Sequence, residues 1–286
     1  WSALTTANQT ASFNVCINKV GPPILAENSS TIAAPTTYTV QQLVTDVLVT
    51  SPCGIVSNIT YSTGTNFGQP QNGIGYFNKN GSSFGLDEGI ILATRSANTC
   101  DGPNDATSEG QNIWAGDAQL LAYMQSVGQS VTNYYNSSKI EFDFVPIADQ
   151  VKFDFIFASD EYGTFQCTFA DAFAFLLTDL VTGVTTNLAV VPGTSAPVSV
   201  VTIRDTLYNS SCASVNPGFF DTYYSGATNY TSAINFNGQT AEMTASSAII
   251  PNHPYHIKLV VADRSDSAFD SAVFIKAGSF TTGPPQ

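Results

Sequence analysis

Two neighbouring segments of the chain alternate strictly between apolar and polar residues, and this alternation constrains the fold more than any other feature. The segments Lys139–Val145 and Val151–Phe157 each place isoleucine or phenylalanine at every second position. A period of two residues is that of a β-strand with one buried face, not that of a helix. The turn between the segments contains Pro146. The pattern therefore predicts two antiparallel strands joined as a hairpin.

Most of the other apolar runs are also short enough to be strands. Two segments indicate helices instead: one begins with a capping box formed by Thr39 and Gln42, and the other follows Asp117. The second helix has an apolar stripe of Leu120, Leu121, Met124 and Val127. We expect further strands at residues 13–20, 55–61, 89–94, 172–177, 187–191, 199–203, 240–245, 256–262 and 272–277. The predicted fold is all-β, mainly an antiparallel, jelly-roll-like β-sandwich with two short helices.

The length of 286 residues suits one large β domain with short additions. We expect residues 1–36 to form an N-terminal extension, residues 37–280 the β-sandwich, and residues 281–286 a C-terminal tail. The extension contains one predicted strand, Phe13–Val20. Alternation places Phe13, Val15 and Ile17 on one face of this strand and Cys16 on the other.

The charge of the chain excludes several functions. Nine lysine and arginine residues stand against 22 aspartate and glutamate residues, for a net charge of −13 at pH 7. Such a surface repels phosphate, so we expect no binding of nucleic acid. No apolar run reaches the roughly 18 residues of a membrane span, so we expect no insertion into a membrane. The start of the chain at Trp1 lacks the basic segment of a signal peptide, and we expect a processed form.

Cysteines and glycosylation sequons indicate an extracellular location. The five cysteines include no CxxC or CxxH pair, which favours disulfides over a zinc or haem site. We expect the bonds Cys53–Cys100 and Cys167–Cys212, with Cys16 left either as a free thiol or bonded to another chain, although spacing alone leaves the connectivity open. The predicted glycosylation sites are Asn8, Asn28, Asn58, Asn80, Asn136, Asn209 and Asn229.

Carboxylates gather beside small residues after two of the predicted strands, in segments 157–173 and 261–273. If these loops meet, their like charges repel, and Ca²⁺, which takes six to eight oxygen ligands, would relieve the repulsion. A third loop with oxygen-bearing side chains can contribute as well. The candidate ligands are Asp160, Glu161, Asp171, Asp263, Asp266, Asp270, Asn104 and Asp105. The alternative is that these residues cap loops or pair with Arg264 and Lys258.

Several motifs, in order over residues 37–280, resemble a known family. They are Tyr38–Val47, Asn72–Phe84, Asp87–Thr94, Gly102–Asn104, Ile140–Phe144, Phe155–Tyr162, Val191–Thr194, Pro254–Lys258 and Asp270–Phe274. Together they resemble the bacterial choice-of-anchor L domain, which occurs in secreted and surface proteins with varied C-terminal anchors. The resemblance implies a cell-surface, adhesive or matrix role and no established catalysis. Because the chain ends at Gln286 without an anchor, we expect either a removed anchor or attachment by assembly with other chains.

Two enzyme interpretations are weak. Glu141 and Asp143 resemble the paired carboxylates of sandwich-fold glycosidases, but Pro146 stands where a further acid is needed. We expect these two residues to form a solvated strand face. His253 and His256 lack the HExxH helix of a zinc protease and point to opposite faces of an extended chain. We therefore predict that the chain is not an enzyme.

The predicted function is that of a non-catalytic extracellular surface module for adhesion or structural display, stabilised by calcium. Its loops would bind a cell-surface glycan or protein, with Tyr223, Tyr224 and Tyr230 as candidates for stacking on a glycan. The alternative is a glycosylated subunit of an extracellular filament or sheath, in which the N-terminal strand is added to a sheet edge of the next copy. A carbohydrate-active enzyme is a second and disfavoured alternative.

Overall fold

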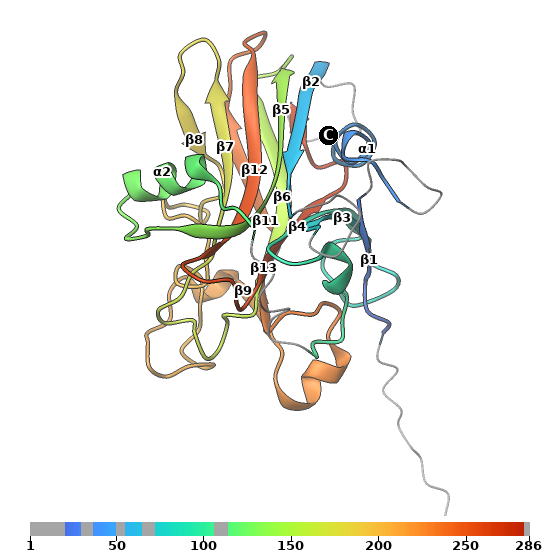
Figure 1. Ribbon diagram of the computed structural model, residues 1–286, viewed down its shortest axis with the longest axis vertical. Coiled ribbons are helices and arrows are strands. Elements are labelled where there is room, and N and C mark those ends of the chain that lie inside the picture. The colour runs from blue at the N-terminus through green and yellow to red at the C-terminus, as the bar shows by residue number, and fades with distance from the viewer. Residues whose placement is uncertain (1–20, 30–36, 50–54, 65–71, 106–113, 283–286) are drawn as a thin grey trace, which may run out of the picture.

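The computed structural model describes residues 21–29, 37–49, 55–64, 72–105 and 114–282, which form a sandwich of two β-sheets (Figure 1). The larger sheet has nine strands in the order β1-β3-β4-β13-β6-β10-β9, with β11 and β14 also paired with β6. The smaller sheet has five strands in the order β2-β5-β12-β7-β8. The pairs within both sheets are antiparallel, as in β5–β12 and β6–β13. The predicted fold class is therefore confirmed.

The elements have the following bounds. The larger sheet contains β1 (Leu25–Asn28), β3 (Ile74–Asn78), β4 (Glu88–Ala93), β6 (Gln150–Ser159), β9 (Phe220–Tyr223), β10 (Gly238–Thr240), β11 (Met243–Ala248), β13 (Ser271–Lys276) and β14 (Thr281–Thr282). The smaller sheet contains β2 (Ile55–Ser62), β5 (Tyr134–Val145), β7 (Ala172–Asp179), β8 (Thr185–Asn187) and β12 (Tyr255–Arg264). The helical elements are α1 (Val40–Gln42), η1 (Leu43–Leu48), η2 (Ala97–Thr99), α2 (Ala118–Ser126), η3 (Pro217–Phe219) and η4 (Gly226–Thr231).

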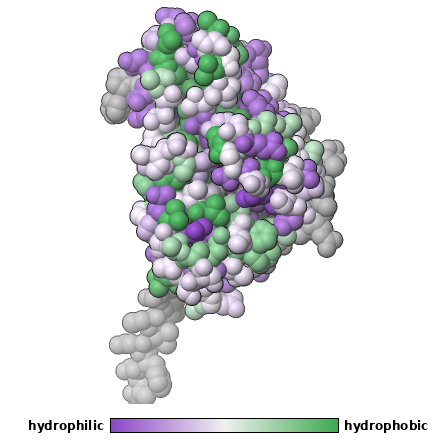
Figure 2. Space-filling view, turned by 90° about the vertical axis from the view of Figure 1, so that its left-hand side faces the viewer, coloured by the Kyte–Doolittle hydropathy of each residue, from purple (hydrophilic) through white to green (hydrophobic). Residues whose placement is uncertain are grey.

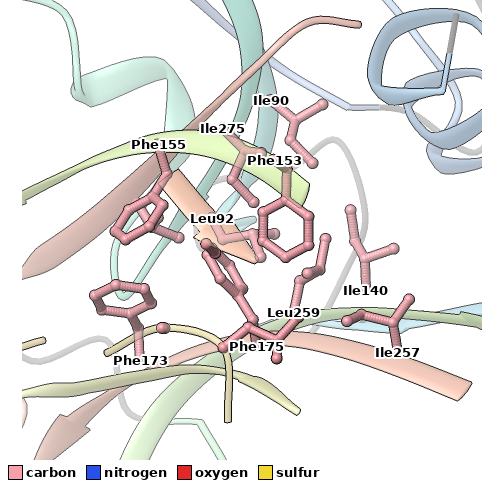
Figure 3. Packing of buried hydrophobic residues seen from close by; sticks show 14 of the residues in the cluster. Ile90, Leu92, Ile140, Phe153, Phe155, Phe173, Phe175, Ile257, Leu259 and Ile275 are labelled. Atoms are coloured by element: carbon pink, nitrogen blue, oxygen red, sulfur yellow. The ribbon is translucent and has the colours of Figure 1, made fainter. Parts of the chain in front are cut away.

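The hydrophobic core lies between the facing sheets, where the apolar side of each alternating strand is buried (Figure 3). Phenylalanine rings from β6 meet those from β7 across the sandwich. The ring centroids of Phe153 and Phe175 are 4.6 Å apart, and those of Phe155 and Phe173 are 5.4 Å apart, both in edge-to-face geometry. Such pairs contribute about 0.5–1.5 kcal/mol beyond the burial of their surface.

The predicted hairpin is wrong, although both of its strands exist. β5 pairs with β2 and β12 in the smaller sheet, whereas β6 pairs with β13 in the larger one. The turn through Pro146 therefore crosses from one sheet to the other. The alternation of apolar and polar residues shows which face of a strand is buried, but not which strand is its neighbour. Two strands that face each other across a core alternate in the same way as two strands that are neighbours in one sheet. Phe280 fills the space between Phe142 of β5 and Phe153 of β6.

Both predicted helices are present and begin as predicted. The Thr39 side chain accepts a hydrogen bond from the Gln42 backbone N–H at 3.2 Å, and Gln42 Oε1 accepts one from the Thr39 N–H at 2.9 Å. Asp117 caps α2 by accepting from the backbone N–H of Leu120 at 2.8 Å. The apolar stripe of α2 is shorter than predicted, because Val127 lies beyond the last helical turn and is 43% exposed.

Three predicted strands differ from the structure. Residues 199–203 form a hydrogen-bonded turn, in which Ser199 accepts from the Ile203 N–H, so this prediction is wrong. A strand was expected at 187–191, but β8 ends at Asn187. The Asn187 side chain accepts hydrogen bonds from the backbone N–H groups of Phe175 and Ala189, in place of hydrogen bonds between two strands. The strand expected at 240–245 is divided between β10 and β11. The predicted strand at 13–20 lies outside the described residues, whereas residues 25–28 of the predicted extension form β1.

Candidate functional site

Five carboxyl side chains meet at one end of the sandwich. Two follow the last residue of β6, one precedes β7, one lies near the end of β12, and one precedes β13. The pairing of Ser159 with Ser271 and of Ala172 with Ala262 brings these strand ends together. All five are buried, with at most 3% of each residue exposed. This acidic cluster consists of Asp160, Glu161, Asp171, Asp263 and Asp270.

Hydrogen bonds within the cluster come mainly from backbone N–H groups and short side chains. Asp171 accepts from the Ser271 hydroxyl at 2.7 Å and from the Arg264 backbone N–H at 2.9 Å. Its own backbone N–H donates to Glu161 at 3.1 Å. Asp263 Oδ2 accepts from the Asn136 amide at 2.7 Å, whereas Asp263 Oδ1 is buried without a hydrogen-bond donor.

One cation, Arg95, lies among these carboxylates and is 1% exposed. Its Nη1 atom lies 3.3 Å from Asp160 Oδ2 and 3.9 Å from Asp270 Oδ2. The guanidinium carbon lies 4.3 Å above the centre of the Phe236 ring, in cation–π geometry. Arg95 could not be identified from the sequence, because a single arginine after a buried strand carries no distinctive pattern. The structure shows that it pairs with Asp160.

Burial dominates the electrostatics of the cluster. It raises the pKa of Asp160 and Asp263 well above the usual range of a carboxyl group, and neighbouring carboxylates add to the effect. Burial also raises the pKa of Glu161 and Asp171, and Asp171 further raises the pKa of Glu161 by repulsion. The cluster therefore holds more potential negative charge than Arg95 neutralises. Protons or a bound cation have to supply the remainder.

The other predicted ligands lie near the cluster but not in it. Asp266 is exposed in the loop between β12 and β13, and its charge raises the pKa of Glu161. Asn104 reaches the cluster through one intermediate: its amide donates to the Asn237 side chain at 3.0 Å, and the Asn237 backbone N–H donates to Asp160 at 3.2 Å. Asp105 accepts from the Asn235 amide at 3.2 Å. Thus five of the eight predicted residues come together.

The arrangement is not a ready-made metal site. Among the described residues, no three histidine, cysteine, aspartate or glutamate side chains are placed to hold one metal ion. Most carboxylate oxygens of the cluster already accept hydrogen bonds from protein donors. The predicted alternative of pairing with Lys258 is wrong, because Lys258 binds Asp117 at 3.1 Å on the outer face of the smaller sheet. Arg264 contributes its backbone N–H to Asp171.

A second ionic group lies on that outer face. His256 of β12 lies between two carboxylates of β5, with Nδ1 at 2.7 Å from Asp143 and Nε2 at 3.1 Å from Glu141. Both contacts favour the imidazolium ion, so the pKa of His256 is raised, chiefly by the hydrogen bond to Glu141. Glu141 and Asp143 thus lie on a partly exposed strand face, as expected, and pair with His256. His253 lies elsewhere, 3.8 Å from Asp179.

The cysteines fall into two groups. A disulfide joins Cys167 to Cys212, which is the predicted bond, and it ties the segment after β6 to the loop that precedes β9. Cys100 is fully buried in a separate hydrophobic cluster that also contains Phe77 and Phe274. Cys53 and Cys16 lie outside the described residues, so the predicted Cys53–Cys100 bond and the intermolecular role of Cys16 stay predictions.

The sequons differ in their accessibility. Asn58, at an irregularity within β2, and Asn80, in a turn, are both exposed and have positive backbone φ angles of 53° and 51°, which asparagine adopts more readily than most residues. Asn136 is only 1% exposed and donates to Asp263, so a glycan does not fit there in this fold. Asn28, Asn209 and Asn229 are half-buried. Asn8 lies outside the described residues.

The fold and the cluster define a large antiparallel β-sandwich whose loops are organised around buried carboxylates. The chain belongs to the choice-of-anchor L domain family, whose model matches residues 30–281, nearly the whole chain. This family is a non-enzymatic type of module in secreted and cell-surface proteins. No curated protein and no solved structure matches the chain significantly. Within the described residues, no helix is long and apolar enough to cross a membrane.

Proposed function

We propose that this chain is a module for adhesion or structural display at a cell surface, and that its acidic cluster binds Ca²⁺. One observation carries the calcium proposal: five buried carboxyl groups share a single buried guanidinium, and Asp263 Oδ1 accepts no hydrogen bond. A buried acceptor without a partner costs about 1–3 kcal/mol, more when it is charged. Ca²⁺ suits this environment because it prefers carboxylate and carbonyl oxygens.

Calcium binding would need small changes of side-chain rotamer, because the carboxylates do not yet converge on one point. Asp263 and Asp171 are the central candidates, since both are fully buried and Asp171 raises the pKa of both Glu161 and Asp263. Asp266, exposed at the surface of the cluster, would complete the ligand set from the solvent side. Bound Ca²⁺ would neutralise the carboxylates in place of the protons that these groups hold when no cation is bound.

The adhesive role rests on the loops that the cluster holds. The loop after β6 is fixed by Glu161 and by the disulfide of Cys167. Large side chains at this end of the sandwich are exposed, with Leu207 at 76% and Tyr230 at 82%. Rigid loops that carry exposed aromatic and aliphatic groups suit binding of a cell-surface glycan or protein. Of the tyrosines expected to stack on a glycan, Tyr230 is the accessible one, whereas Tyr223 and Tyr224 are half-buried.

The test is a calcium titration of the folded chain, followed by calorimetry and by the melting temperature with and without a chelator. Binding that raises the melting temperature, and that Asp263→Asn weakens at least tenfold, is the expected result. Asp87→Asn is the matched control, because the Asp87 side chain is 89% exposed and distant from the cluster. Absence of calcium binding, with a melting temperature that a chelator leaves unchanged, would refute the calcium proposal.

A filament subunit is the second candidate function, and a specific observation favours it. At the end of the sandwich opposite the acidic cluster, an open groove lies between two edge strands, one from each sheet. A groove of this kind is where a strand from another copy can be added.

A further inference from the structure

The groove opens the hydrophobic core to solvent on one side of the sandwich. Its volume is about 400 Å³. Its floor consists of Leu177 of β7, Tyr255 of β12 and Ile249 after β11, each of which belongs to the main core cluster. Val184 and Ile250 line it nearer the surface and are 62% and 51% exposed. Polar side chains, among them Asp179 and Thr186, also line the groove, so a segment lying in it would extend the core and contact a polar rim.

Two unpaired strand edges border the groove. β8 is the last strand of the smaller sheet and pairs with β7, and β11 pairs with β6 in the larger sheet. Among the described residues, neither strand has a partner on its second edge. An unpaired edge presents a row of backbone N–H and C=O groups and is a template for another strand. The groove thus offers both hydrogen-bonding partners and apolar contacts.

Exposed apolar side chains gather around this end of the molecule, as the space-filling view of the β8 side shows near its top (Figure 2). The exposed apolar residues of the three turns at this end are Ile147, Leu180, Val181, Val184 and Ile250, with exposures between 48% and 67%. Single exposed apolar residues are ordinary, but a contiguous group of them marks an interaction site.

The sequence offers a matching occupant. Residues 13–20 alternate, with Phe13, Val15 and Ile17 on one face, which is the pattern of a strand with one face in an apolar groove. They lie outside the described residues and precede Gly21, from which the described chain begins. Eight extended residues span about 27 Å, enough to run along all six residues of β11.

The described chain begins at the end of the sandwich away from the groove. The backbone N–H of Ile24 donates a hydrogen bond to the carbonyl of Ala233. Two residues further on, the carbonyl of Asn235 accepts a hydrogen bond from Arg95, so Ile24 lies near the acidic end of the sandwich. The groove lies at the other end, where β7 finishes and β12 starts. The ten residues of β12 separate the two ends by about 33 Å. Because Val20 is bonded to Gly21, it cannot lie in the groove of its own chain.

We infer that the groove between β8 and β11 accepts residues 13–20 of a second copy of this chain. The added strand directs Phe13, Val15 and Ile17 towards Leu177, Ile249 and Tyr255, and its backbone extends an open sheet edge. Gly21, from which the donor segment leaves the described chain, and the groove lie at opposite ends of the molecule, so the contact is head-to-tail. A head-to-tail contact that does not close into a ring produces an open filament. The inference deepens the filament alternative and does not depend on calcium binding.

The test uses the full chain and light scattering over a wide range of protein concentration. The wild-type chain is expected to form a series of multiples of the 30.3 kDa subunit. Phe13→Asp removes the donor, and Val184→Asp with Ile250→Asp removes the acceptor at exposed positions where the fold tolerates the change. Each variant alone is expected to keep the mass of one subunit. Val127→Asp is the matched control, because Val127 is 43% exposed just after α2 and does not line the groove, and this variant is expected to assemble like wild type.

Mixing the two defective variants gives the decisive result. The donor of the groove variant can still enter the intact groove of the Phe13→Asp variant, and no second contact can follow. The mixture is therefore expected to stop at a dimer. Wild-type chain that keeps the mass of one subunit at all concentrations, or assembly that persists in both variants, overturns the inference. Repeating the series in chelator keeps the two proposals apart: assembly is expected to be unchanged there, because the strand contact needs no calcium, whereas the calcium site stands or falls on the calcium titration alone.

Discussion

The Ser271 hydroxyl donates a 2.7 Å hydrogen bond to the Asp171 carboxylate, and this contact joins the two sheets at the acidic end of the sandwich. Ser271 begins β13 of the larger sheet, and Asp171 directly precedes β7 of the smaller one. Both residues are buried, so the bond lies in a medium of low polarity, where it is strengthened and its loss is costly. A serine therefore couples the packing of the sheets to the ionisation of the cluster.

Replacing Ser271 with alanine is expected to destabilise the fold by about 1–3 kcal/mol, because it removes a donor from a buried carboxylate. Urea unfolding at neutral pH measures the loss. Ser246→Ala is the control, since Ser246 is exposed on β11, and surface substitutions typically change stability by less than about 0.5 kcal/mol. Equal stability of the two variants would mean that the Ser271 contact contributes nothing.

Removal of the buried cation is expected to be more damaging. Arg95→Leu leaves Asp160 and Asp270 without their guanidinium, and an uncompensated buried charge costs about 3–5 kcal/mol. Lys79→Leu removes a cation from an exposed pair with Asp87, which contributes about 0–1 kcal/mol. Thermal unfolding compares the two. If Arg95→Leu melts no lower than Lys79→Leu, the pairing of Arg95 is not important for stability.

The sequence predicted the faces of the strands better than their partners. The alternation around Phe142 and Phe153 correctly identified two strands and their buried sides. It could not show that the strands lie in different sheets, because partner choice depends on contacts distant in the sequence. The turn at residues 199–203 was mistaken for a strand, since Val200 and Ile203 are apolar and buried without belonging to a ladder.

The acidic cluster was predictable because its residues lie at strand ends. Asp160 follows β6 and Asp270 precedes β13, and antiparallel strands place such ends together. Arg95 and Asn136 could not be identified, since no local pattern distinguishes a buried arginine or a buried asparagine from an exposed one. The sequon at Asn136 suggested a glycan for the same reason: the motif is local, whereas burial depends on the whole fold.

His256 is expected to make stability depend on pH. Its pKa is raised above 6.5 on folding by Glu141 and Asp143, so its contribution is fully present below about pH 6.5 and is lost as the pH rises through the folded pKa. The difference in unfolding free energy between wild type and His256→Asn, measured from acid to alkaline pH, should shrink above neutrality. A difference that is the same at every pH would show that folding leaves the pKa of His256 unchanged.

The Cys167–Cys212 disulfide is expected to stabilise the loops at the acidic end. It closes a segment with a sequence separation of 45, and loop-closure entropy gives a contribution of about 4 kcal/mol, an upper value if the unfolded chain keeps structure. The double variant Cys167→Ser with Cys212→Ser should unfold at correspondingly lower urea concentration. Reductant should shift the unfolding midpoint of the wild type to that of the variant. If reductant leaves the wild-type midpoint unchanged while the variant is destabilised, the lost stability comes from the packing of the two replaced side chains and not from the disulfide bond.

Protons and calcium are expected to stabilise the acidic cluster at opposite ends of the pH range. Burial raises the pKa of Asp171 and Glu161 on folding. The folded state therefore binds more protons than the unfolded state, and stability falls as the pH rises from about 4 through the folded pKa values.

Calcium would occupy the cluster in place of these protons and would stabilise the ionised form most at high pH. The unfolding free energy in chelator is expected to decline with pH, and added Ca²⁺ should flatten that decline, with its largest effect at alkaline pH. The variant Asp171→Asn should reduce both the decline and the calcium effect. A decline that Ca²⁺ leaves unaltered would show that protons alone neutralise the cluster, and the loops at this end would then be held by hydrogen bonds such as that from Ser271.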